Sequence, residues 1–133
     1  KRVLFVCIGN CCRSQMAEGF ANTYGRDVLA AGSAGLAPTV SIDADTLRTM
    51  REKNIDISLQ FPKRFDPLEA LDCDLIVNMS GYDLPEPVEA PVREWKIRDP
   101  YRLRPEIYKQ VCEDIENQVM QLILELRRSA RGL

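Results

Sequence analysis

The 133-residue sequence contains no histidine. An imidazole therefore cannot act here as a general base, as a metal ligand, or as the group that activates a serine or cysteine nucleophile. Any chemistry must rely on thiols, carboxylates, guanidinium groups and the backbone. The candidate catalytic residues are therefore cysteines, acidic residues and arginines.

Long apolar runs are absent as well. Lys1-Arg2 is followed by only a short apolar stretch, Val3 to Val6, with no small-residue cleavage pattern, and no other run is long enough to cross a bilayer. The net charge of -2 gives no reason to expect a nucleic acid or a membrane as partner. We therefore expect a cytoplasmic protein that binds neither.

The five cysteines do not suggest a disulfide framework. Their number is odd, and Cys7, Cys11 and Cys12 crowd into one short stretch where they could not connect distant parts of the chain. A closed zinc site needs four ligands in paired spacings, which this crowding and the lack of histidine do not provide. We expect a reducing compartment, no metal and no organic cofactor.

The length allows one domain, spanning residues 1–133, with a single core. Apolar runs with β-branched residues alternate with segments of helical periodicity. This pattern predicts an α/β fold, a three-layer sandwich with a small four-stranded parallel sheet and helices on both faces. The expected strands are residues 3–7, 28–31, 75–77 and 92–97, and the expected helices are residues 14–25, 43–54 and 105–132, with a loop over 32–41.

Ligands of such sheets bind at the carboxyl ends of the strands, so the loop after the first strand is the first candidate site. It reads Cys7-Ile8-Gly9-Asn10-Cys11-Cys12-Arg13-Ser14. A loop that curls on Gly9 and Asn10 before a helix can point its backbone N–H groups inward and bind a tetrahedral oxyanion. The same positive field would stabilise a thiolate at Cys7.

Two side chains that follow the loop have complementary roles. The planar guanidinium of Arg13 can hold two oxygens of a phosphate-like anion, which a lysine could not do in the same geometry. The Ser14 hydroxyl is placed to donate a hydrogen bond to the sulfur of Cys7. The strand before, the glycine within and the helix after make this pattern more specific than the Cys-to-Arg spacing alone.

With these residues the chain resembles the low-molecular-weight protein tyrosine phosphatase family. The resemblance lies in Val6 to Asn10 and Cys12 to Gly19, and it continues in Ser33-Ala34-Gly35, Ile55 to Ser58 and Asp99-Pro100-Tyr101. It implies that Cys7 is the nucleophile, that Arg13 binds the transition state, and that Asp99 acts as acid and then as base.

The resemblance also implies a substrate pocket. Tyr101 would be a wall of it, and Leu36 and Val40 would replace a tryptophan that the family has in the preceding loop. The expected function is hydrolysis of aryl phosphates through a phosphocysteine. The expected partners are a phosphorylated protein, notably one bearing phosphotyrosine, or a small aryl phosphate, with inorganic phosphate or arsenate as ligand.

Arsenate reductases share this fold and loop, and Gln15 to Gly19 is somewhat more similar to that branch. Their thioredoxin-coupled members carry resolving cysteines after the strand that matches Leu75 to Asn78, where this chain has Met79-Ser80-Gly81-Tyr82. Arsenate reduction with an external small thiol is therefore the alternative. Tyr101 favours the phosphatase, which is the main prediction.

A redox role is expected for one further cysteine. The family often has a second cysteine at the position of Cys12, which implies a reversible Cys7–Cys12 disulfide that would protect Cys7 from irreversible oxidation. Cys11 could substitute or compete. Cys73 and Cys112 are expected to be inert thiols.

Overall fold

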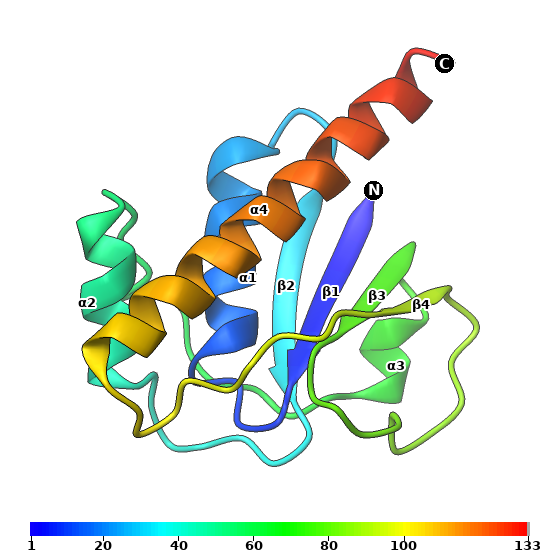
Figure 1. Cartoon of the computed structure of the whole chain (residues 1–133). Coiled ribbons are helices and arrows are strands. Elements are labelled where there is room, and N and C mark those ends of the chain that lie inside the picture. The colour runs from blue at the N-terminus through cyan, green and yellow to red at the C-terminus, as the bar shows by residue number, and fades with distance from the viewer. Residues whose placement is uncertain (133) are drawn as a thin grey trace.

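The computed structural model describes residues 1–132 (Figure 1). Its sheet has the order β2-β1-β3-β4, and every neighbouring pair of strands is parallel. The strands are β1 (Arg2–Cys7), β2 (Ala30–Gly35), β3 (Leu75–Asn78) and β4 (Val92–Glu94). The helices are α1 (Arg13–Tyr24), α2 (Ala44–Glu52), α3 (Pro67–Ala70) and α4 (Pro105–Ala130).

The central strand β1 shows why both faces of the sheet are covered. Side chains alternate along a strand, so Val3 and Phe5 enter the core formed with α1 and α4, whereas Leu4 and Val6 enter a smaller core that includes Ala70 of α3. Figure 1 shows α1, α2 and α4 on one side of the sheet and α3 on the other. The predicted three-layer α/β fold is confirmed.

The last helix closes the larger core. Pro105 starts α4, as suits a residue without an N–H donor, and the helix then runs to Ala130. Its buried side chains recur every three or four residues and form one face: Tyr108, Val111, Cys112, Ile115, Val119, Leu122 and Ile123. The side chain of Ile123 lies where a side chain at Gly25, the C-cap residue that follows α1, would be.

Three elements differ from the sequence-based prediction. β2 covers Ala30–Gly35 rather than residues 28–31, because pairing with β1 makes a strand of small residues that have little strand propensity of their own. β4 ends at Glu94 and does not reach residue 97. The one-turn helix α3 was not predicted at all. Within residues 1–132, no helix is long and apolar enough to cross a membrane.

Candidate active site

The loop between β1 and α1 lies at the carboxyl end of the central strand. Cys7 is the last residue of β1 and Arg13 is the first residue of α1, so the sheet and the helix fix both ends of the loop. The Cys7 side chain is buried, and its Sγ lies 2.8 Å from the hydroxyl oxygen of Ser14. The hydrogen bond predicted between these two groups is therefore present.

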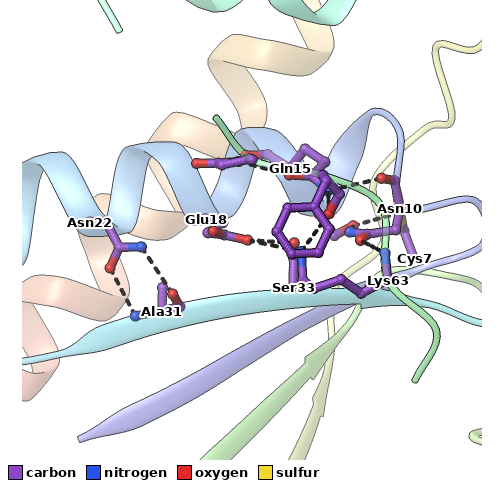
Figure 2. Close-up of polar contacts among 11 residues, drawn as sticks. Cys7, Asn10, Gln15, Glu18, Asn22, Ala31, Ser33 and Lys63 are labelled. Atoms are coloured by element: carbon purple, nitrogen blue, oxygen red, sulfur yellow. Dashed lines mark hydrogen bonds and ion pairs between the residues drawn. The ribbon is translucent and has the colours of Figure 1, made fainter. Parts of the chain in front are cut away.

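Asn10 holds the loop in its curled form (Figure 2). It adopts a left-handed backbone conformation with φ of 50°, which asparagine tolerates better than most residues. Its Nδ2 donates to Ser14 Oγ at 2.7 Å, and its Oδ1 accepts from the backbone N–H of Lys63 at 2.9 Å. Because Ser14 Oγ accepts from Asn10, its own proton is free to point at the sulfur of Cys7.

A second layer of polar side chains supports Asn10. Gln15 Nε2 donates to the Asn10 carbonyl at 3.0 Å, and Gln60 Nε2 donates to Gln15 Oε1 at 2.7 Å. Farther along α1, Figure 2 shows Glu18 and Asn22 bonded to Ser33 and Ala31 of β2. The side-chain amides of Asn10, Gln15 and Gln60 are thus hydrogen-bonded, which keeps the shape of the loop rigid.

The end of β2 lies directly against the loop. A Cβ at Gly35 would be 2.8 Å from the Ile8 carbonyl oxygen and 2.9 Å from the Asn10 nitrogen, both backbone atoms that cannot rotate away. The chain then continues beside the loop, since the N–H groups of Leu36, Ala37 and Thr39 donate to the carbonyls of residues 7, 8 and 9. Only glycine allows this close approach.

We therefore expect Gly35→Ala to displace the loop. The clash should destabilise the fold by about 1–3 kcal/mol, the usual cost of overpacking, and should weaken binding of inorganic phosphate about tenfold or more. Thermal unfolding and calorimetric titration measure the two effects. Gly32→Ala on the same strand is the matched control, because its nearest atom would be 3.8 Å away. Equal behaviour of the two variants would contradict the close-approach argument.

Arg13 is anchored by two carbonyl groups from the segments that follow β3 and β4. It is 5% exposed, and its Nη1 donates to the carbonyl oxygens of Met79, just after β3, and of Ile97, after β4. Its other terminal nitrogen, Nη2, lies 3.7 Å from Asp99 Oδ2. The structure thus brings Arg13 and Asp99 together, although 86 positions of sequence numbering (99 minus 13) separate them.

These groups surround one cavity of about 160 Å³. Its lining consists of Cys7, Ile8, Gly9, Cys11, Cys12, Arg13, Ala37, Thr39, Asp99 and Tyr101. A larger cavity of about 320 Å³ is bordered by Arg2, Ala30 and Cys73, but its arginine is exposed and no strand-to-helix loop contributes to it. The chemistry of the lining therefore points to the smaller cavity as the candidate active site.

Two predicted wall residues do not line this cavity. Val40 is fully exposed, and Leu36 packs against the smaller core on the α3 side of the sheet. The chain bends at Leu36 and Ala37 after β2, so that Ala37 and Thr39 line the cavity and Leu36 does not. The assignment of Leu36 and Val40 is corrected accordingly. No sequence pattern marked Ala37 or Thr39.

Asp99 and Tyr101 form the rim opposite the loop. The Asp99 side chain is 46% exposed and accepts from the backbone N–H of Tyr101 at 3.1 Å. Tyr101 is 41% exposed, with the guanidinium of Arg102 over its ring at 5.2 Å. A carboxyl group at this position can exchange protons with a ligand bound to the loop. The roles of Asp99, Tyr101, Cys7 and Arg13 remain predictions.

All five cysteines are free thiols. Cys112 is buried in α4, and burial raises its pKa to about 12, as expected of an inert thiol. Cys7 and Cys12 line the same cavity, and a disulfide between them remains a prediction. In the part of the chain from residue 1 to residue 132, no three cysteine or acidic side chains are grouped so as to hold a metal ion.

The comparisons with known proteins agree with this geometry. The family model described as "Low molecular weight phosphotyrosine protein phosphatase" matches residues 2–86. A relative named glutaredoxin arsenate reductase, from Synechocystis sp., is 34% identical over 130 residues, which are 95% of this chain and 98% of the relative.

Two solved structures share the fold over nearly the whole chain. One is an arsenate reductase in the phosphate binding state, with a TM-score of 0.86, 34% identity, and coverage of 95% of this chain and 98% of that one. The other is a low molecular weight protein tyrosine phosphatase from T. tengcongensis, with a TM-score of 0.82, 29% identity, and coverage of 93% and 98%.

These findings correct the main functional prediction. The sequence pattern favoured an aryl phosphatase because Tyr101 follows Asp99-Pro100 and because resolving cysteines are missing after β3. The relatives named above are arsenate reductases over almost their full length, at higher identity than the phosphatase. The comparisons therefore favour the alternative, arsenate reduction. Tyr101 was too weak a marker, because it is a half-exposed rim residue and carries none of the reacting groups itself.

Proposed function

Since the chain belongs to the low molecular weight phosphotyrosine protein phosphatase family, whose enzymes act through a cysteine, we propose that it reduces arsenate to arsenite with electrons from an external small thiol. The observation that carries the proposal is the cavity built from Cys7, Arg13 and the anion-binding loop, in a chain 34% identical to a named arsenate reductase over 95% of its length.

The first step would form a bond between Cys7 Sγ and arsenic. Arsenate is tetrahedral, like phosphate, and fits a loop whose N–H groups and Arg13 surround an oxyanion. As the S–As bond forms, one oxygen leaves as water, and Asp99 lies where its carboxyl group can supply the proton. Arsenic remains pentavalent in this adduct.

The second step requires another thiol. Its thiolate attacks Cys7 Sγ, an S–S bond forms, and the electron pair of the S–As bond leaves with arsenic, which becomes trivalent. A further thiol then reduces the disulfide and regenerates Cys7. In sum, arsenate and two thiols give arsenite, one disulfide and water.

The location of the cysteines outside the loop supports an external reductant. Residues 79–82 after β3 contain no cysteine, Cys112 is enclosed in the core, and Cys73 borders the other cavity. The name of the Synechocystis relative suggests glutathione with glutaredoxin as the source of electrons. Five free thiols also favour a reducing, cytoplasmic location.

The test is a coupled assay. The full chain, glutathione, glutaredoxin, glutathione reductase and NADPH are mixed, and oxidation of NADPH is followed after arsenate is added. We expect arsenate-dependent turnover on the order of 1 per second, within the ordinary enzyme range, and none when phosphate replaces arsenate. The proposal would be refuted if NADPH oxidation in the complete mixture, with glutathione alone or with glutaredoxin added, were no faster than in the same mixture without the protein.

A further inference from the structure

Cys11 and Cys12 are neighbours in sequence whose sulfur atoms lie close together. Their Sγ atoms are 3.6 Å apart, and both residues line the cavity that contains Cys7. Consecutive side chains of an extended chain point in opposite directions. Here the backbone of Cys12, with φ of -133° and ψ of -88°, is neither extended nor helical, and the two sulfur atoms lie on the same side of the chain, close to each other.

This pair is poorly suited to a direct disulfide. Consecutive Cα atoms across a trans peptide are about 3.8 Å apart, whereas disulfides usually join Cα atoms about 4.4–6.8 Å apart. No cis peptide bond is present in residues 1–132 to change this separation. A heavier atom bound to both sulfurs at about 2.3 Å, the length of a zinc–thiolate bond, would span the observed gap without moving the backbone.

We propose that Cys11 and Cys12 form a dithiol site for trivalent arsenic, with arsenite as its ligand. Two S–As bonds form and two As–O bonds break, the two thiol protons leave with the two oxygens as water, and arsenic stays trivalent throughout. Trivalent arsenic needs only two sulfurs and can keep one oxygen. Zinc would require four ligands, and residues 1–132 hold no grouping of three or more cysteine and acidic side chains for one.

The surroundings of the pair favour the thiolate form of one of the two cysteines, the form that attacks arsenic. The hydrogen bond between the two thiols lowers the pKa of Cys11, whereas that bond and burial raise the pKa of Cys12. Cys12 Sγ also lies 3.5 Å from the hydroxyl of Tyr108, which donates to Asp43. Cys11 thus ionises first, with Cys12 as its hydrogen-bond donor, and forms the first S–As bond. The second S–As bond, to Cys12, then closes a ring that contains arsenic and both sulfurs.

The consequence for the enzyme rests on the proposed function. Arsenite released from Cys7 would be generated inside the cavity that the dithiol lines, so the protein would retain its own product until a competing thiol removed it. Retention by two thiols should be much stronger than by one, since the second bond is intramolecular; such linkage typically strengthens binding by about 10²–10⁴-fold.

The experiment measures arsenite binding without any turnover. The full chain is reduced with a phosphine that is then removed, and arsenite is titrated while bound arsenic is counted by native mass spectrometry. Alkylation with N-ethylmaleimide and peptide mapping then identify the protected thiols. The variants are Cys11→Ser, Cys11→Ala, Cys12→Ser and Cys7→Ser, with Cys73→Ser as a remote control and thermal unfolding as the check on folding.

We expect one arsenite per chain, protection of Cys11 and Cys12, and binding retained in Cys7→Ser and Cys73→Ser. Binding should fall about 100-fold in Cys12→Ser and in both Cys11 variants. Absence of binding to the parent, or loss in Cys7→Ser with retention in the Cys11 variants, would overturn the proposal. Because no arsenate is present, these outcomes are independent of the coupled assay, which tests the proposed function alone.

Discussion

Replacing Cys7 by serine is expected to abolish arsenate-dependent NADPH oxidation, a loss on the order of 10⁴-fold or more, as when a catalytic nucleophile is removed elsewhere. A serine hydroxyl cannot form the S–As bond, and it cannot supply the sulfur that becomes oxidised when arsenic is reduced. The substitution removes little volume at a buried position, so the fold should persist. Circular dichroism and thermal unfolding test that point.

The control for Cys7→Ser is Cys73→Ser. Cys73 is a partly exposed thiol that borders the other cavity. It should keep the parent rate within about twofold, since surface substitutions away from special features have small effects. If Cys7→Ser retained a substantial share of the parent rate while Cys73→Ser lost it, the nucleophile would have been assigned to the wrong cysteine.

Arg13→Lys is expected to lower the rate of arsenate reduction by about 10²–10³-fold, the effect of removing one preorganised donor from a site of developing charge. Lysine keeps the positive charge but lacks the planar fork that can hold two oxygens. It also cannot reproduce the two hydrogen bonds to Met79 and Ile97 at once while still facing Asp99.

The same substitution should also lower stability, by about 1–3 kcal/mol, because a buried carbonyl would lose its donor. Steady-state rates over a range of arsenate concentrations and urea unfolding separate the two effects. Arg48→Lys is the matched control, as Arg48 is exposed on α2 and forms an ion pair with Asp45. A rate of arsenate reduction in Arg13→Lys equal to that of the parent would show that a positive charge alone is enough for catalysis. It would contradict the argument that the planar guanidinium is required.

Several parts of the fold could be read from the sequence because their signals are local. The run Val3 to Cys7 is apolar on both faces, as a central parallel strand must be. Pro105 and the regular spacing of apolar residues defined α4. Cys7, Gly9 and Arg13 lie within one short loop, so their spacing predicted a shared anion site before any tertiary contact was known.

The elements that were mispredicted depend on neighbours distant in sequence. β2 consists of alanine, glycine and serine, and it becomes a strand because β1 supplies its hydrogen-bond partners. The small size of these residues serves the packing of α1, whose Asn22 and Glu18 bond to β2. Strand propensity reflects packing on a half-buried surface and therefore does not predict this pairing of a small-residue strand with β1 and α1.

By itself, then, the sequence determined the class of fold, the position of the loop from Cys7 to Arg13 and the absence of imidazole chemistry, since each follows from residue types at short separations. Only the tertiary structure decided which distant groups meet at the loop. These are the carbonyl groups that orient Arg13 and the end of β2 at Gly35, which packs closely against the loop backbone. The tertiary structure also placed Cys11 and Cys12 at one cavity. The reason is physical. The spacing of residues within a segment limits which secondary structure that segment can form, whereas packing of the whole chain decides which other segments lie beside it.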